Sequence, residues 1–275
     1  QWEKLGIFSL NLETRRFACR LGTRLFLGID GGDPILSDFD ILTGLDETSD
    51  LREARQRVLR WLEQWSPEQA PKGQYCIGPQ LARSRILSRD ELLNEIKHGL
   101  ASTVDMWTPL VELLRQATSD PALAAPLREE ISALAGSLSL RHMAKTPRLM
   151  SLIQDALRRT TPVPYFFARA KCSFIFQGVQ IPANAVLIGA LHATSQCSAE
   201  DEKHVAFGSG SHQCPGSDLV TVTMWLFATK LLKSYCLEGL DPTDVPVRTN
   251  RVRFAPRGYF VRCSRGSLAV APTPS

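Results

Sequence analysis

The residues with the clearest potential for chemistry surround one cysteine. Residues 207–216 read FGSGSHQCPG, so Cys214 lies among glycines, serines and a proline, which are typical of a loop. An apolar-periodic stretch, 217–239, follows directly and predicts a helix. Cys214 is therefore expected where a loop meets a helix N-terminus, and there the backbone N–H groups and the helix dipole favour an anion. Such a position suits a thiolate, the form of cysteine that attacks electrophiles and binds metals.

The elements that must position this cysteine are mostly helices. Apolar spacing predicts helices over 11–29, 50–65, 88–117, 120–138 and 146–160. The first should end near Gly28, and Ser88 with Glu91 three residues later forms a capping box at the start of the third. Residues 171–191 are rich in β-branched and aromatic types and predict short strands, and 252–271 is typical of a β-hairpin. We expect a mainly α fold with a small β region, as a single domain over 1–275.

Composition excludes several classes of protein. The chain has 275 residues, of which 44% are hydrophobic, so it can bury a large core. Its 32 basic and 28 acidic residues give a net charge of only +4, which does not indicate binding to nucleic acid. We find no apolar run long enough to span a bilayer and no secretion signal at the N-terminus. Seven scattered cysteines, an odd number, indicate a reduced setting, so we expect a cytoplasmic protein.

The cysteine loop matches Phe-x-x-Gly-x-His-x-Cys-x-Gly and so resembles the haem-binding loop of the cytochrome P450 family. The resemblance implies haem b as cofactor and Cys214 as the thiolate ligand of its iron. It also implies that His212 binds a haem propionate. The other loop positions that the resemblance assigns to cofactor binding are Phe207, Gly208, Gly210 and Gly216.

The segment 152–171 (LIQDALRRTTPVPYFFARAK) supports the same resemblance. Asp155 and Arg158 occupy the paired positions of the family's Glu-x-x-Arg helix, with aspartate in place of glutamate. Arg169 resembles the family arginine that pairs with a haem propionate. The resemblance further implies that the segment between them contacts substrate, through Val163, Tyr165 and Phe167; without it, these three would be interpreted as buried strand residues.

The oxygen-activating helix departs from the family pattern. The family usually places an acid followed by a threonine beside the iron, to relay protons. Counting back from Asp120–Pro121 places that pair in 101–106 (ASTVDM), where Val104 and Asp105 occupy the two positions and Thr103 precedes them. A second register places 95–100 there, again without the pair. Thr103 and Asp105 are the catalytic candidates, as a reversed pair; the alternative is that Asp105 only caps a local helix bulge.

Two parts of the family pattern are missing. The family's N-terminal sheet, its first substrate-contacting loop and a helix with further propionate ligands have no counterpart here, so the expected P450 fold is incomplete at the N-terminus. The meander loop, with its third structural arginine, is missing between Arg158 and Cys214. Abrupt transitions near 42–53 and 195–204 favour the interpretation that the chain joins pieces of a longer protein; a truncated relative is the alternative.

The resemblance implies a monooxygenase, or an oxidative coupling enzyme, that acts on an apolar organic substrate of secondary-metabolite type. Ferredoxin or a reductase would be its electron-transfer partner. A haem-thiolate isomerase or cyclase, a peroxide-driven enzyme and a non-catalytic haem-binding relative remain alternatives. A zinc site or a structural cysteine is the alternative to haem. The spacings match no common zinc finger, although five candidate ligands fall within 23 residues: His192, Cys197, His204, His212 and Cys214.

Overall fold

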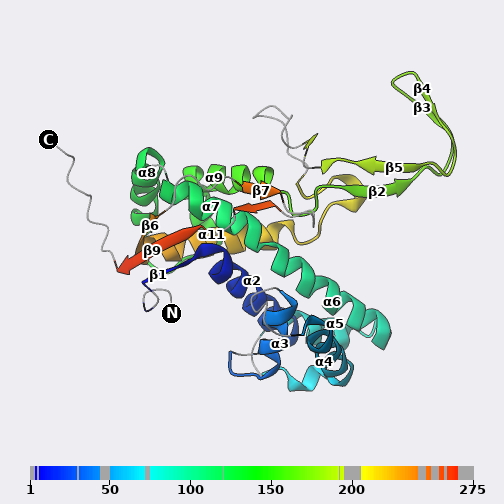
Figure 1. Ribbon diagram of the computed structural model, residues 1–275, viewed down its shortest axis with the longest axis horizontal. Helices are drawn as coiled ribbons and strands as arrows, with labels where there is room; N and C mark the ends of the chain where they lie inside the picture. The colour runs from blue at the N-terminus through cyan, green and yellow to red at the C-terminus, as the bar shows by residue number, and fades with distance from the viewer. Residues whose placement is uncertain are drawn as a thin grey trace. The chain divides into compact units, whose positions relative to one another are not determined.

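The computed structural model describes residues 4, 6–29, 31–43, 50–71, 75–119, 121–191, 193–194, 206–240, 246–248, 254–256 and 259–265. The chain divides into two compact units, Ile7–Trp107 and Thr108–Ser275, the second of which also includes Gln1–Gly6. Helices dominate both units and the strands are short, as the sequence predicts (Figure 1). In the described part of the chain, no helix is both long and apolar enough to cross a membrane.

The unit Ile7–Trp107 is built around two helices that pack along each other, α2 (Leu10–Leu27) and α6 (Arg89–Asp105). Their approach is close because Gly99 of α6 faces the Phe26 ring: a Cβ at Gly99 would lie 2.1 Å from Cε1 of Phe26. The remaining elements of this unit are β1 (Ile7–Ser9), α3 (Ile35–Leu42), α4 (Leu51–Gln64), the 3-10 helix η1 (Pro67–Gln69) and α5 (Ile77–Ser84).

Helix ends in this unit follow local sequence signals. Gly28 ends α2 in the left-handed conformation, with φ of 74°, as predicted. The predicted capping box at α6 is confirmed: Glu91 N–H donates to Ser88 Oγ, and Ser88 N–H donates to Glu91 Oε2 at 2.8 Å. The Ser88 hydroxyl also donates to Glu91 Oε2, at 2.7 Å. This bond and the one from the Ser88 N–H stabilise the charged carboxylate and lower the pKa of Glu91.

The predicted single helix over 88–117 is wrong, because the structure breaks it at Met106. Helix α6 ends at Asp105 and α7 (Trp107–Ser119) begins after one turn residue. The cause is Pro109, whose ring lacks an N–H and clashes with the carbonyl four residues earlier, that of Asp105. The Met106 N–H instead donates to the Thr103 carbonyl, at 3.2 Å. Asp105 therefore lies at a helix break and not inside a continuous helix.

The second unit contains α7, α8 (Pro121–Ser132), α9 (Pro147–Arg159) and α11 (Ser217–Ser234), and the 3-10 helices η2 (Leu140–Lys145) and η3 (Gly210–His212). Helices α8, α9 and α11 pack on one another. The buried Trp225 of α11 donates its Nε1–H to Thr146 Oγ1, at 2.8 Å, at the start of α9. Lys233 Nζ, near the end of α11, donates to the Leu134 carbonyl beyond α8.

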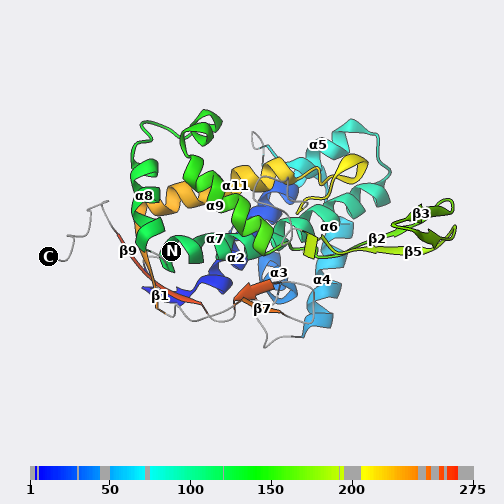
Figure 2. The ribbon, with the colours of Figure 1, turned by 90° about the horizontal axis from the view of Figure 1, so that it is seen from above.

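Four antiparallel strand pairs complete this unit. They are β2 (Phe166–Arg169) with β5 (Val186–Gly189), β3 (Phe174–Phe176) with β4 (Val179–Ile181), β6 (Tyr235–Gly239) with β9 (Phe260–Arg265), and β7 (Pro246–Arg248) with β8 (Phe254–Pro256). The predicted strands in 171–191 are confirmed, and the turn between β3 and β4 has positive φ at Gln177 and Gly178, as a two-residue hairpin turn requires. Figures 1 and 2 show β2–β5 and β3–β4 projecting from the helices of this unit as one arm.

Two predictions in the C-terminal part are wrong. The helix expected over 217–239 ends at Ser234, and 235–239 is strand β6. The expected hairpin over 252–271 does not form either: β8 pairs with β7, and β9 pairs with β6. The pairing of β6 with β9 places Leu237 opposite Cys263, both buried. Such long-range burial decides the conformation here and leaves no local periodic signal.

Helix α9 receives an N-terminal cap from another helix. Its own Thr146 makes no side-chain cap, and Pro147 at its first position has no N–H. The Glu130 carboxylate of α8 accepts the next two N–H groups, those of Arg148 and Leu149, each at 3.0 Å. The carboxylate satisfies two end groups and complements the positive end of the helix dipole.

Removal of this cap should destabilise the protein measurably. We expect Glu130→Ala to lower the free energy of unfolding by about 1 kcal/mol, which is the usual effect of losing an N-cap. Chemical denaturation measures it, with Glu129→Ala, an exposed neighbour in the same helix, as the control. Equal losses in the two variants would contradict a capping role for Glu130.

Candidate functional site

The backbone around Cys214 folds into a closed loop. The Cys214 N–H donates to the Phe207 carbonyl at 2.8 Å, which joins the two ends of the loop. Gly216 then begins α11: its carbonyl accepts the Val220 N–H at 2.9 Å. The Cys214 side chain is exposed, and a Cβ placed on Gly216 would lie 3.7 Å from its Sγ. The thiol thus lies beside the glycine backbone that precedes a helix N-terminus, where the sequence predicts it.

Two glycines make this loop possible. Gly208 has φ of 71° and Gly210 has φ of 64°, values in the left-handed region that cost other residues roughly 1–2 kcal/mol. A side chain at Gly208 would also approach the His212 carbonyl to 3.3 Å. Two of the three glycines that the resemblance assigns to this site therefore shape its backbone.

The two side chains predicted to bind haem propionates are exposed. His212 ends the short helix η3, two residues before Cys214. Arg169 is the last residue of β2, and its Nη1 donates to the Asn184 carbonyl at 3.3 Å. Both side chains are thus accessible to an anionic ligand, and their proposed role stays a prediction.

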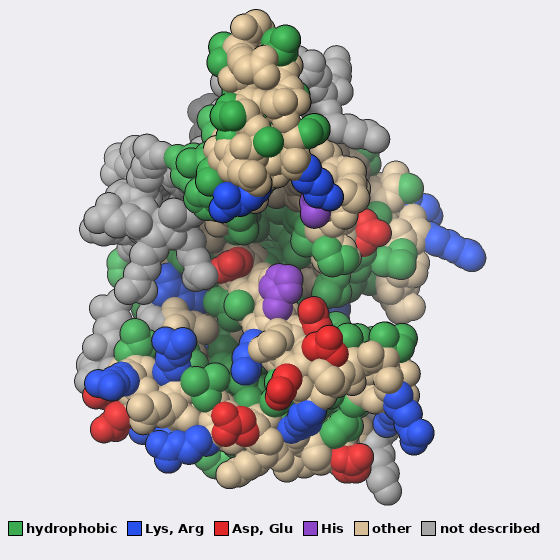
Figure 3. Space-filling model, turned by 90° about the vertical axis from the view of Figure 1, so that its right-hand side faces the viewer, with side chains coloured by type: hydrophobic (Ala, Val, Ile, Leu, Met, Phe, Trp, Pro, Cys, Tyr) green, Lys and Arg blue, Asp and Glu red, His purple; other side chains and the backbone are tan. Residues whose placement is uncertain are grey.

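The three predicted substrate-binding residues also lie on the surface. Val163 is 55% exposed, Tyr165 37% and Phe167 73%, so the structure does not bear out their interpretation as buried strand residues. Phe167 lies on β2 opposite Ile188 of β5, which is itself exposed. Figure 3 shows other hydrophobic side chains over the surface of the arm. Their contact with substrate remains a prediction that rests on the resemblance.

The two candidate relay residues lie at the end of α6. The Thr103 hydroxyl donates to the Gly99 carbonyl of its own helix at 2.8 Å, and its Cβ and methyl group face Gly22 of α2. Asp105 is half-buried at the helix break that Pro109 imposes. The Thr103 hydroxyl is therefore engaged by its own helix, and Asp105 is the last residue of that helix.

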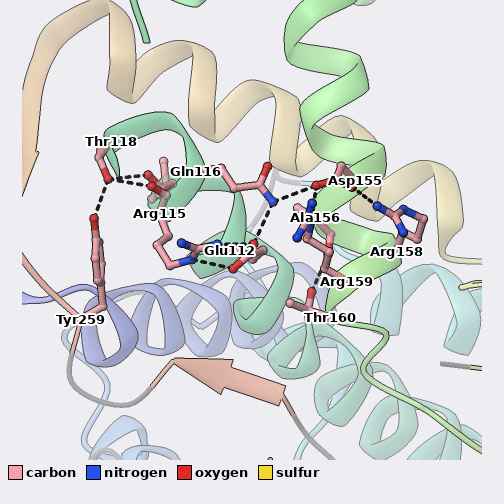
Figure 4. A network of polar contacts seen from close by, with 11 residues as sticks. Glu112, Arg115, Gln116, Thr118, Asp155, Ala156, Arg158, Arg159, Thr160 and Tyr259 are labelled. Carbon is pink, nitrogen blue, oxygen red and sulfur yellow. Dashed lines mark hydrogen bonds and ion pairs between the residues drawn. The ribbon is translucent and has the colours of Figure 1, made fainter. Parts of the chain in front are cut away.

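Asp155 is the centre of a charge network on α9 (Figure 4). It accepts from Arg158 at 2.5 Å, which confirms contact between the two residues paired by the sequence pattern. It also accepts from Arg159 at 2.5 Å, and from Gln116 Nε2 of α7 at 3.0 Å. Burial alone would raise the pKa of the Asp155 carboxyl, but the hydrogen bonds from Arg159 and Arg158 outweigh it and lower the pKa.

The network continues into α7 through residues that sequence reasoning missed. Glu112 is buried and accepts from Arg115 Nε at 2.9 Å and from its Nη2 at 2.8 Å. This bidentate pair raises the pKa of the Arg115 guanidinium. The i,i+3 spacing of Glu112 and Arg115 was a readable signal, but nothing local indicates that Gln116 reaches Asp155. Two residues after Gln116, the hydroxyls of Thr118 and the buried Tyr259 form a hydrogen bond of 3.1 Å.

The zinc alternative gains no support from the described part of the chain. There, no three His, Cys, Asp or Glu residues lie close enough together to hold a metal ion. Three of its candidate ligands, His192, Cys197 and His204, lie outside the described residues. None of the six described cysteines is in a disulfide.

The fold of this chain is similar to those of solved cytochrome P450 structures. The retinoic acid-bound cyanobacterial CYP120A1 matches with a TM-score of 0.80 over 96% of this chain and 71% of that chain, at 20% identity. A zebra fish cytochrome P450 with abiraterone matches with a TM-score of 0.75 over 94% of this chain and 72% of the other, at 16% identity. No family model matches the sequence.

Cytochromes P450 are also similar to this chain in sequence. Cytochrome P450 family 716 subfamily AD polypeptide 4 of Melia azedarach is 24% identical over 178 residues, which cover 56% of this chain and 37% of that protein. Cytochrome P450 11B1, mitochondrial, of Cavia porcellus is 30% identical over 168 residues, which cover 53% of this chain and 33% of that protein. The chain is similar in sequence to cytochromes P450 over about half of its length and has the cytochrome P450 fold. Its matched part spans about a third of the length of these curated relatives.

The lowered pKa of Asp155 predicts a pH dependence. Because the folded-state pKa lies below the unfolded one, the carboxylate stabilises the protein above about pH 4, and this stabilisation is lost as pH falls further. Asp155→Asn should cost about 1–2 kcal/mol of unfolding free energy at pH 7. The gap between wild type and variant should narrow below about pH 4.

Chemical denaturation at pH 7 and at pH 3 measures this gap. Glu238→Gln is the control, because it removes an exposed ion pair with Arg262 in the same unit, which should cost little at either pH. A gap for Asp155→Asn that is unchanged at pH 3 would contradict the assignment.

Proposed function

We propose that the protein is a haem-thiolate oxidoreductase in which the Cys214 thiolate binds the haem iron. One observation carries the proposal: an exposed thiol just before the start of α11, in a loop that Gly208 and Gly210 shape and that the bond from the Cys214 N–H to the Phe207 carbonyl closes. A thiolate ligand needs stabilisation of its charge and access for the metal. The helix N-terminus supplies the first and the exposed position the second.

The residues present fit a haem. The donor set is one accessible sulfur with bare glycine backbone beside it, and Gly216 leaves open the space next to Sγ. Arg169 and His212 are exposed, and they would form charge-assisted hydrogen bonds with the carboxylates of haem b. Phe207, half-buried at the start of the loop, would shield one side of the sulfur from water.

When bound, a haem with a thiolate ligand supplies activation of oxygen or peroxide for oxidation of an organic substrate. We propose an apolar substrate, because the segment Val163–Phe167 presents bulky apolar side chains to solvent. Oxygen-dependent turnover would need electrons from a partner such as ferredoxin or a reductase. The known relatives carry the cytochrome P450 name, which supports this class of reaction.

A second candidate is haem-thiolate chemistry without the usual relay, driven by peroxide or redox-neutral. The bond from the Thr103 hydroxyl to the Gly99 carbonyl favours it, because that hydroxyl is engaged within its own helix. In the first candidate, by contrast, Asp105 would hold the proton for the oxygen-dependent reaction, as the acid of the candidate pair.

The axial-ligand proposal is tested by Cys214→Ser. We expect the variant to lose the thiolate-type Soret band of the reduced, carbon-monoxide-bound protein together with most turnover, because a serine hydroxyl is a poor ligand for haem iron. Cys172→Ser, which alters an exposed cysteine between β2 and β3, should keep both. An unchanged spectrum in Cys214→Ser would show that another residue holds the iron.

The relay is tested by Asp105→Asn, which removes the proton and nearly preserves shape. If Asp105 holds the proton, oxygen-dependent turnover should fall by about 10²–10⁴-fold, the usual effect of losing a general acid. Peroxide-driven turnover should fall less, because peroxide brings its own protons and electrons. A small and equal fall in both rates would restrict Asp105 to a structural role, and full turnover with neither oxidant would favour the isomerase alternative.

A further inference from the structure

Gln116 lies between two ion pairs that belong to different helices. Its Nε2 donates to Glu112 Oε1 at 2.8 Å and to Asp155 Oδ2 at 3.0 Å. Glu112 is held by Arg115 on α7, and Asp155 by Arg158 on α9. Figure 4 shows the Gln116 side chain reaching from α7 toward Asp155. One amide nitrogen therefore bridges two carboxylates.

The residue type suits this position. A primary amide carries two N–H donors on one nitrogen, and both are used here on acceptors. The Glu112 side chain is only 1% exposed, so its remaining capacity must be met inside the protein, because an unmet buried acceptor is costly. A glutamate would bring a third carboxylate against two others, and methionine would fill the space without a donor.

The bridge fixes the end of α9 that leads toward the candidate site. Asp155 is one turn before the end of α9 at Arg159, and the chain continues from there into β2, which ends at Arg169. The N-terminal end of α9 is held separately, by Glu130 and by Trp225 of α11. The bond from Trp225 to Thr146 thus connects α11, which begins after Cys214, with α9, which leads to Arg169.

We propose that Gln116 is a positioning residue: by donating to both Glu112 and Asp155, it holds the Asp155–Arg158 pair and the C-terminal end of α9 in the arrangement needed to retain haem. The second half of this statement rests on the proposed function. Gln116 acts through Asp155 and does not itself contact the cofactor. The charged and titratable groups around it are Glu112, Arg115 and Tyr259 on the α7 side and Asp155, Arg158 and Arg159 on α9.

The first experiment measures thermal unfolding of the haem-free chain at several pH values, for Gln116→Met and Gln116→Glu. Gln116→Met removes both donors, so its melting temperature should fall by a similar amount at every pH. The melting temperature of Gln116→Glu should fall most at pH 8, where a third carboxylate is charged. It should recover as the pH falls toward about 5, because the neighbouring carboxylates raise the pKa of the introduced group. The neutral acid restores one donor.

Matched controls are Gln80→Met and Gln80→Glu, at an exposed position of α5, which should change neither the melting temperature nor its pH dependence. Melting temperatures for both Gln116 variants that match wild type at all pH values would overturn the bridge. Loss in Gln116→Glu without recovery at low pH would also overturn it, because repulsion between the introduced carboxylate and those of Glu112 and Asp155 would then not explain the effect.

The second experiment compares haem content and the carbon-monoxide spectrum of the same variants, at a temperature where all of them are folded. We expect at least a several-fold lower haem occupancy in Gln116→Met, and in Gln116→Glu a recovery of occupancy at low pH. Full occupancy in folded Gln116→Met would leave Gln116 a structural residue and overturn its positioning role. If wild type itself binds no haem with a thiolate-type spectrum, the proposed function fails and the positioning role with it. The unfolding experiment still decides whether the bridge exists.

Discussion

Helix α9 is held by hydrogen bonds from three other helices, and the candidate site depends on that constraint. Glu130 of α8 caps its first turn, Trp225 of α11 bonds to Thr146, and Gln116 of α7 bonds to Asp155. These bonds act at both ends of a helix of 13 residues. Because α11 begins directly after the cysteine loop and α9 leads to β2, the same bonds set the frame for Cys214 and for Arg169.

The buried charge of Glu112 and its partner Arg115 favour one position of α9 over others. Removing Glu112 and Arg115 from water costs free energy, and their mutual attraction offsets that cost only when the remaining hydrogen-bonding groups are also satisfied. The bidentate geometry and the amide of Gln116 satisfy the Glu112 carboxylate. A shifted α9 would take Asp155 away from Gln116 and leave one donor unmet. Such networks favour one arrangement over its near neighbours even where their net stabilisation is small.

Aspartate in place of the family's glutamate at position 155 is accommodated within this network. The shorter side chain still reaches Arg158, and it gains a second arginine, Arg159, four residues along the same helix. Two cations on one helix face therefore compensate a single carboxylate. The lowered pKa of Asp155 shows that these bonds outweigh its burial.

The sequence by itself determined the features that depend on neighbouring residues. The cysteine loop with its left-handed glycines, the capping box at Ser88 and the end of α2 at Gly28 all follow from short-range sterics and hydrogen bonding. The break at Met106 was also local: Pro109 encodes it, although the apolar periodicity concealed it.

The tertiary structure alone decided what depends on residues far apart in the chain. The change from helix to strand after Ser234 follows from pairing with β9, and the meeting of Gln116 with Asp155 follows from helix packing. Local periodicity carries no record of either partner, because a strand pair or a buried hydrogen bond gains its free energy only once both segments have come together.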